Sequence, residues 1–265
     1  MSKTATIASF DAVETWIFDL DNTLYPPTCN LFAEVDRRMG AFIAGLLGLD
    51  ACEARRMQKR YYRDYGTTLH GLMREHHIDP LDFLDYVHDL DLSAVVPDMA
   101  LSAAISSLPG RKFILTNGTR AHAERVAGRI GVLEHFEDIF DIVAGGFVPK
   151  PEPAIYQNFV SRFSVRPRRA VMFEDLSRNL EAPCALGMTT VLVKVASHPH
   201  PDAREDWTPQ DETAAHVHHV IDDLAGFLGK VSSRLKGASE QLTKAGQILN
   251  SPRLSAPRPT RKATQ

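Results

Sequence analysis

The sequence has few cysteines, no long apolar run and little net charge, and each absence excludes a class of protein. Three of its 265 residues are cysteine (Cys29, Cys52 and Cys184), an odd number without CxxC spacing, so we expect neither a disulfide framework nor a zinc-binding cluster. No stretch approaches the roughly 18 apolar residues that a membrane helix needs. The formal net charge of -3 gives no general reason to expect nucleic acid as a partner.

The first residues also lack a targeting pattern. The stretch MSKTATIASFDAVETW does not place a charged segment ahead of an apolar one, as a secretory signal peptide does. We therefore expect a cytoplasmic protein without a membrane partner. A hydrophobic content of 44% over 265 residues is enough for one large domain, or for a core domain with a smaller insertion.

Short β-rich runs alternate with helical patterns along most of the chain, which is typical of parallel βαβ units in an α/β fold. The runs that we interpret as strands are residues 16–20, 112–116, 141–145, 170–175, 189–194 and 216–221. The sequence therefore predicts a core with a parallel sheet, built from residues 1–24 and 96–230.

Residues 25–95 interrupt this alternation, because they contain almost no strand signal. Apolar side chains recur there at helical spacing, at Leu31, Phe32, Val35, Met39, Phe42, Ile43 and Leu46. We predict a helical subdomain inserted after the first strand. Residues 231–265 are poor in aromatics and rich in Ser, Pro and basic residues, so we expect a disordered basic tail with at most one frayed helix.

Polar side chains follow three of the predicted strands. Asp19 and Asp21 end the first, residues 116–118 (Thr-Asn-Gly) follow the second, and the Glu174-Asp175 pair ends the fourth. Because ligands bind outside the carboxyl ends of parallel strands, we expect these residues to share a site. Taken alone, the segment 21–23 (Asp-Asn-Thr) is equally compatible with turn and N-cap chemistry.

These residue types suit phosphoryl transfer from a phosphate monoester. A dianionic phosphoryl group repels an attacking carboxylate, so the site needs positive charge and fixed donors around the phosphoryl oxygens. Lys150 in the loop VPKPEP, the Thr116 hydroxyl and the backbone N–H groups near Asn117 and Gly118 can supply them.

The acidic residues complete this chemistry. Asp19 and Asp175 are suitable oxygen ligands for Mg²⁺, and Glu174 is a candidate base that supports the site without holding the cation. One aspartate can act as nucleophile and form an aspartyl-phosphate, while another serves as general acid and base.

Four short motifs, in order along the chain, resemble those of the haloacid dehalogenase-like (HAD) hydrolases. They are DLDNT at 19–23, LTNG at 115–118, Lys150 in PKPEP, and the Glu174-Asp175 pair followed by Asn179. The resemblance covers about residues 14–228. It implies a Rossmann-like core, and it implies that the inserted helices are a type 1 cap, which closes over the core and helps to choose the substrate.

The resemblance also implies a role for each residue. Asp19 would be the nucleophile and Asp21 the general acid and base. Mg²⁺ would be held by Asp19, the Asp21 carbonyl and Asp175, and the phosphoryl group would be bound by Thr116 and Lys150. Family members that break carbon–halogen bonds lack an aspartate at the position of Asp21, because a halide leaving group needs no proton. Asp21 therefore favours a phosphatase or phosphomutase.

The insertion is similar to that of the pyrimidine 5'-nucleotidase subgroup, in which LYP follows the first motif and a YGTTLxGL segment lies within the cap. This similarity implies hydrolysis of UMP or CMP to nucleoside and phosphate. From the residues alone, Tyr61, Tyr62 and Tyr65 can stack on a flat base, and Thr67 or Thr68 can hydrogen-bond to its edge. Tyrosines at this spacing also pack helices against one another.

Two alternatives remain from the sequence. The same chemistry can act on a small phosphate such as phosphoglycolate or a sugar phosphate, as a phosphatase or as a phosphomutase. A protein of another class, a non-catalytic nucleotide-binding protein, would have kept only the fold, although the complete set of motif residues argues against it. One departure from the nucleotidase subgroup is Leu176, which stands where Ser is common.

Overall fold

The computed structural model describes residues 10–194 and 211–249. Within them, six strands form one parallel sheet in the order β3-β2-β1-β4-β5-β6. The strands are β1 (Thr15–Phe18), β2 (Arg111–Leu115), β3 (Asp138–Phe140), β4 (Ala170–Glu174), β5 (Thr189–Val193) and β6 (His219–Ile221). The parallel α/β, Rossmann-like core that the sequence predicted is confirmed.

The register of the central strands brings the predicted site residues to one edge of the sheet. Phe18, near the end of β1, pairs with Ile114 of β2 and with Phe173 of β4. The three strands therefore end at nearly the same level. The polar residues that follow them emerge side by side, as expected at the carboxyl edge of a parallel sheet.

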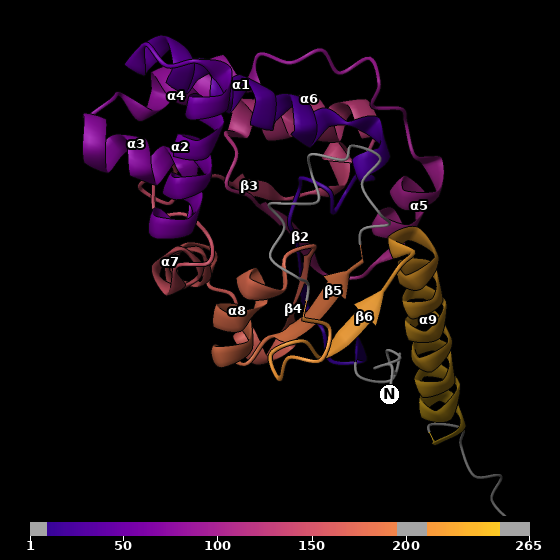
Figure 1. Ribbon diagram of the computed structural model, residues 1–265. Helices are drawn as coiled ribbons and strands as arrows, with labels where there is room; N and C mark the ends of the chain where they lie inside the picture. The colour runs from indigo at the N-terminus through magenta and orange to yellow at the C-terminus, as the bar shows by residue number, and fades with distance from the viewer. Residues whose placement is uncertain (1–9, 195–210, 250–265) are drawn as a thin grey trace, which may run out of the picture.

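Alternation along the buried strands fills a hydrophobic core on each face of the sheet. In β1, Trp16 and Phe18 belong to one core, whereas Ile17 belongs to the other. Helices α5 (Met99–Ser107), α6 (Arg120–Ile130) and α9 (Leu224–Leu249) contribute to the first core. Helices α7 (Pro153–Phe163) and α8 (Glu181–Ala185) contribute to the second (Figure 1).

Five α-helices lie between β1 and β2 in the chain, and the first four form the helical insertion. They are α1 (Leu31–Leu47), α2 (Ala51–Tyr65), α3 (Thr68–His76) and α4 (Pro80–His88). Side-chain caps start three of them: Asp50 forms a capping box for α2, Thr67 caps α3 and Asp79 caps α4. Figure 1 shows the insertion grouped at one end of the molecule, opposite the free end of α9.

The third predicted strand is wrong by a few residues. Residues 141–145 do not form a strand, and β3 lies just before them at Asp138–Phe140. The Asp141 carboxylate accepts hydrogen bonds from the backbone N–H groups of Arg120 and Ala144, so this segment is a turn that also caps α6. Strand β6 is likewise shorter than predicted, because it begins only at His219.

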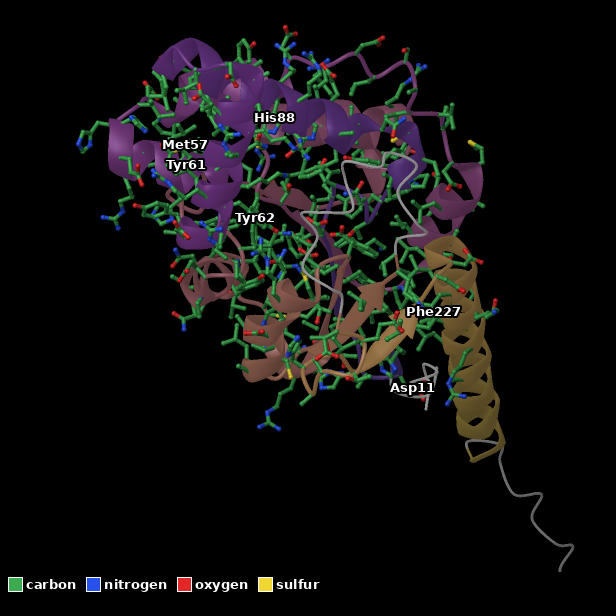
Figure 2. All side chains as sticks on the ribbon, in the orientation of Figure 1. Asp11, Met57, Tyr61, Tyr62, His88 and Phe227 are labelled. Atoms are coloured by element: carbon green, nitrogen blue, oxygen red, sulfur yellow. The ribbon has the colours of Figure 1, made fainter. Side chains whose placement is uncertain are left out.

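Residues 231–265 were expected to be a disordered tail with at most one frayed helix, and residues 231–249 of this segment continue helix α9. Leu224, Phe227, Leu228 and Val231 recur at helical spacing and are buried. Figure 2 labels Phe227 on α9 beside the sheet, and its ring packs against that of Phe10. Predictions for residues 1–9, 195–210 and 250–265 concern parts of the chain outside the described residues.

No helix in the described part of the chain combines the length and the apolar character that crossing a membrane requires.

Candidate active site

Asp19 lies directly beyond β1, where it forms a buried ion pair with Lys150. The Lys150 Nζ atom lies 2.6 Å from Asp19 Oδ1 and 2.8 Å from Glu174 Oε1, and it also donates to the Leu115 carbonyl at 3.0 Å. Burial alone would lower the pKa of Lys150, but the Asp19 and Glu174 carboxylates outweigh burial and raise it above its ordinary value. Lys150 is therefore a fixed positive charge beside Asp19.

Asp175 adds a third carboxylate to this cluster. Asp19, Glu174 and Asp175 are all buried, and one oxygen from each lies within 4.8 Å of the others. Burial raises the pKa of Asp19 to about 7, with Lys150 opposing and Glu174 and Asp21 adding to the rise. Burial, Glu174 and Asp19 together raise the pKa of Asp175 well above its ordinary value. The cluster thus holds more negative charge than Lys150 compensates.

The donor set of this cluster fits a hard divalent cation. If all three carboxylates were ionised beside one ammonium, they would leave an excess of two negative charges, and the raised pKa values of Asp19 and Asp175 reflect this crowding. The buried amide oxygen Asn179 Oδ1 has no hydrogen-bond partner among the described residues. Asn179 Nδ2 donates to Glu174 at 2.6 Å, so this unpaired oxygen belongs to a residue that contacts the cluster. Buried carboxylate and amide oxygens are the ligands that Mg²⁺ prefers.

Both Glu174 oxygens are already engaged. Oε1 accepts from Lys150 and Asn179, and Oε2 accepts from the backbone N–H of Leu176 at 2.7 Å. These bonds hold the loop after β4 in place. Leu176, the residue that departs from the subgroup pattern, therefore still contributes a hydrogen bond through its backbone.

The loop after β2 holds the predicted phosphate-binding residues in different ways. Thr116 is buried, and its Oγ1 accepts from the Gly118 N–H at 2.9 Å. The Asn117 side chain is bound by the protein itself. It exchanges two hydrogen bonds with the Lys150 backbone, at 2.8 and 3.1 Å, and thereby fixes the Lys150 loop to the β2 loop. Thr116, Asn117, Gly118 and Lys150 all line the same cavity.

Asp21 lies at the cavity wall, and two side chains hold its carboxylate. Tyr25 donates its hydroxyl to Oδ1 at 2.6 Å, and His122 Nε2 lies 3.1 Å from the same oxygen. Burial alone would raise the pKa of Asp21, but His122 and then Tyr25 outweigh burial and lower it to about 2. Asp21 is therefore ionised at neutral pH, which is the form that accepts a proton.

Sequence reasoning missed His122 and His88. His122 is 2% exposed and lies in the first turn of α6. The His88 ring, from the end of α4 in the insertion, stacks on the His122 ring with centroids 4.3 Å apart. The position of His122 only four residues after Gly118 was the available signal, but the contact with Asp21 joins residues 101 apart in the sequence.

A cavity of about 630 Å³ lies between the carboxyl edge of the sheet and the insertion. Asp19, Asp21 and Asp175 line it from the sheet side. The insertion contributes apolar side chains, among them Phe32, Met39 and Phe83, and also polar and charged ones, among them Arg55, Lys59, Tyr62, Thr67 and His88. The volume and the mixture of apolar and polar groups are typical of a small-molecule site.

Of the three tyrosines predicted to contact a flat ligand, Tyr62 lines the cavity (Figure 2). Its hydroxyl accepts from the Arg178 guanidinium at 2.6 Å, and the guanidinium carbon lies 4.5 Å from the ring centroid. Tyr61 is fully buried within the insertion, where its hydroxyl meets His76. Tyr65 donates to Glu75 and lies outside the cavity lining.

Thr67 and Thr68 both line the cavity, as a contact with a ligand requires. The Thr67 Oγ1 atom accepts from the His70 N–H as the N-cap of α3, and Thr68 is buried at the start of that helix. The Thr67 hydroxyl hydrogen remains available as a donor, because capping uses the oxygen only as an acceptor.

Solved structures share this fold at low sequence identity. CbbY from Rhodobacter sphaeroides, a mutant in complex with xylulose-(1,5)bisphosphate, aligns with a TM-score of 0.56 and 20% identity, over 80% of this chain and 95% of CbbY. An L-2-haloacid dehalogenase aligns with a TM-score of 0.53 and 17% identity, over 83% of this chain and 99% of the dehalogenase. At these identities the likeness concerns the fold.

Two curated proteins are similar in sequence. Phosphate metabolism protein 8 of Saccharomyces cerevisiae is 27% identical over 203 residues, which are 68% of this chain and 61% of the yeast protein. The chain thus spans less than two thirds of that relative. Enolase-phosphatase E1 of Frankia alni is 42% identical over 65 residues, 24% of this chain and 27% of the relative.

The family model of the haloacid dehalogenase-like hydrolases matches residues 13–187, well over half of the chain. The matched segment contains Asp19, Asp21, Lys150 and Asp175, the residues that the sheet edge brings together. The chain therefore belongs to the haloacid dehalogenase-like hydrolase family.

Proposed function

We propose that this hydrolase is a Mg²⁺-dependent phosphomonoesterase that works through an aspartyl-phosphate. One observation carries the proposal: Asp19, held by Lys150, and a second aspartate, Asp21, line the same cavity. A phosphate ester needs both, because its leaving alcohol must be protonated whereas a halide need not be. The names of the two curated relatives, a phosphate metabolism protein and an enolase-phosphatase, agree with this chemistry.

In the first step, an Asp19 carboxylate oxygen attacks phosphorus and the ester P–O bond breaks. The leaving alkoxide takes a proton from Asp21. Thr23 donates to Asp19 Oδ2 at 3.0 Å and Lys150 binds Oδ1, so both oxygens of the nucleophile are oriented. Lys150 and the Thr116 hydroxyl lie at the cavity wall, where they can bind phosphoryl oxygens.

In the second step, Asp21 takes a proton from water and the resulting hydroxide attacks phosphorus. The bond between phosphorus and Asp19 breaks, which releases phosphate, and the proton on Asp21 passes to solvent once the phosphate has left. Asp21 is ionised in the absence of a phosphate group, as its low pKa shows. A bound dianionic phosphate raises the pKa of a nearby carboxyl, which favours the protonated form that the first step needs.

Mg²⁺ would be held by Asp19, the Asp21 carbonyl and Asp175, with Glu174 behind them as the partner of Lys150. When bound, the cation neutralises charge on the transferring phosphoryl group. This assignment accounts for the crowding of three buried carboxylates beside one ammonium.

Within this chemistry, we infer that the substrate is a pyrimidine nucleoside monophosphate. The cavity of about 630 Å³ has room for a group much larger than phosphate, and its insertion wall offers the Tyr62 ring and the Thr67 and Thr68 side chains. In this interpretation the insertion is a cap, Tyr62 stacks on the base and a threonine hydrogen-bonds to the base edge. Tyr65, which lies outside the cavity, is left out of this assignment.

Truncation of Tyr62 tests the contact with the base. Tyr62→Ala is expected to raise KM for UMP by about tenfold, because stacking on an aromatic ring contributes about 1–3 kcal/mol per base. KM for p-nitrophenyl phosphate and phosphoglycolate should change little. Steady-state kinetics on the three substrates provide the measurement. Tyr65→Ala is the matched control, since this tyrosine on the same helix hydrogen-bonds to Glu75 outside the cavity.

A substrate panel tests the proposed specificity. Phosphate release is measured with Mg²⁺ and with EDTA on UMP, CMP, dTMP, AMP, GMP, phosphoglycolate, glucose phosphates and p-nitrophenyl phosphate. We expect the highest kcat/KM on UMP and CMP, and loss of release with EDTA. Faster hydrolysis of phosphoglycolate or a sugar phosphate would reject the nucleotidase assignment, and an isomerised sugar phosphate without released phosphate would indicate a mutase.

A further inference from the structure

We propose that His122 is a positioning residue for proton transfer. Together with Tyr25, it holds one oxygen of Asp21 so that the other oxygen is directed to the leaving group and to water. This inference rests on the proposed function, because it assumes that Asp21 is the general acid and base. It adds a residue from outside the four motifs to the acid–base machinery.

The hydrogen-bond pattern around Asp21 is one-sided. The Tyr25 hydroxyl and His122 Nε2 both end on Oδ1, at 2.6 and 3.1 Å. Because Oδ1 is already the acceptor of the Tyr25 hydroxyl, we take His122 as a second donor to it, through Nε2–H. Among the described residues, none donates a hydrogen bond to Asp21 Oδ2, and Asp21 lines the cavity. The substrate therefore meets a carboxylate with one oxygen fixed and the other available.

The local fold fixes the position of the His122 ring. Thr119 caps α6 by accepting from the His122 backbone N–H at 3.2 Å, so His122 occupies the third position of the helix. Its side chain is 1% exposed. A Cβ atom on Gly118 would lie only 3.1 Å from His122 Cδ2 and 3.4 Å from Thr116 Oγ1. The glycine of the LTNG segment thus leaves the space that the imidazole fills.

His88 closes the other side of this ring. The two imidazoles stack at an interplanar angle of 15°, and His88 Nδ1 lies 3.3 Å from Thr119 Oγ1 at the start of α6. His88 ends α4, so the insertion itself packs against the residue that holds Asp21. The packing of the insertion against the core is therefore linked to the orientation of the Asp21 carboxylate.

A comparison of two leaving groups distinguishes a positioning role of His122 from a purely structural one. Protonation by Asp21 matters for an alkoxide leaving group and much less for p-nitrophenolate, which is stable without a proton. The test compares first-turnover rates, measured by rapid quench, on the best alkyl phosphate of the panel and on p-nitrophenyl phosphate. His122→Leu removes the donor and keeps an apolar side chain, whereas His122→Gln keeps an N–H donor at a similar reach.

We expect His122→Leu to lower the first-turnover rate on the alkyl phosphate by roughly tenfold or more, because hydrogen bonds to charged groups are among the strong ones. The first-turnover rate on p-nitrophenyl phosphate should fall by less than about threefold, because its leaving group needs no proton. His122→Gln should recover most of the alkyl rate. In an Asp21→Asn background, His122→Leu should cause no further loss, since the two residues act as one unit.

His135→Leu is the matched control, because this histidine hydrogen-bonds to Ser102 and lies outside the cavity lining. Its two rates should equal those of the wild type. Equal losses on both leaving groups in His122→Leu, or a further loss in the Asp21→Asn background, would overturn the positioning role while leaving the proposed function intact. Wild-type turnover by Asp21→Asn itself would instead overturn the proposed function and this inference with it.

Discussion

Replacing Asp19 by asparagine is expected to lower phosphate release by roughly ten-thousand-fold or more, because the variant lacks the nucleophile of the first step. Asparagine has the same shape as aspartate, so the substitution changes chemistry more than packing. Asp19 is 6% exposed, its Oδ1 binds Lys150 and its Oδ2 accepts from Thr23. An amide oxygen can keep the contact with Lys150, and the amide NH2 can donate to the Thr23 hydroxyl instead. The measurement is kcat on the best substrate of the panel, with Mg²⁺ present.

The control for this prediction is Asp11→Asn. Asp11 forms an exposed ion pair with Arg234 of α9, and its removal should leave kcat unchanged. Thermal unfolding of the Asp19→Asn variant shows whether it is folded. A folded Asp19→Asn protein with more than a few per cent of wild-type turnover would show that another group attacks phosphorus.

Replacing Lys150 by methionine is expected to destabilise the protein by about 3–5 kcal/mol at neutral pH, the typical cost of removing one partner from a buried ion pair. Lys150 is 2% exposed and contacts both Asp19 and Glu174, so its loss leaves a buried carboxylate cluster without a cationic partner. Methionine fills a similar volume, which limits the contribution of a cavity. Activity should fall as well, since the phosphoryl group loses a ligand.

Urea unfolding in EDTA measures this loss without stabilisation by a bound metal. Lys112→Met is the matched control, because Lys112 also belongs to the sheet but its ammonium donates to the Gly110 carbonyl. The loss should shrink as the pH is lowered from about 7 towards 4. Burial raises the pKa of Asp19 and Lys150 opposes that rise, so without Lys150 the folded variant takes up protons in this window more readily than the folded wild type does. A Lys150→Met variant as stable as Lys112→Met would contradict the described ion-pair cluster.

The central strands were predictable because each is a short, buried, continuous apolar run, as parallel strands covered on both faces must be. The observed bounds of β1, β2, β4 and β5 differ from the predicted ones by one or two residues. Strand β3 was misplaced because FEDIFDIVAG contains two similar runs, and periodicity alone cannot rank them. The strand ends before Asp141, because the Asp141 carboxylate binds the start of helix α6.

The extent of helix α9 was not predicted, for a related reason. The composition of residues 231–265 indicates disorder, but the apolar spacing from Leu224 to Val231 continues across the assumed boundary. That face packs on α5, and tertiary burial of this kind stabilises a helix whose own propensity is modest. Composition describes residues 231–265 as a whole, whereas one buried helix face is enough to order the first part of this segment.

The candidate site was predictable where chemistry depends on position along a strand. Asp19, Thr116 and Asp175 emerge together because their strands are aligned in register. The contacts of the insertion were not predictable, since they depend on which face of each helix turns inward. Tyr61, Tyr62 and Tyr65 share helix α2, yet packing of Tyr61 against Gly71 leaves Tyr62 in the cavity wall. His122 and His88 meet only after the insertion folds onto the core.

If hydrolysis passes through a phosphoryl group on Asp19, that intermediate should accumulate when the second step is blocked. Asp21→Asn keeps the nucleophile but lacks the base that activates water. With p-nitrophenyl phosphate and Mg²⁺, this variant should release one nitrophenolate per site in a burst, and mass spectrometry should find one phosphoryl group on the peptide that contains Asp19. An Asp21→Asn enzyme that turns over normally, or that releases nitrophenolate without a phosphorylated Asp19 peptide, would contradict the aspartyl-phosphate mechanism.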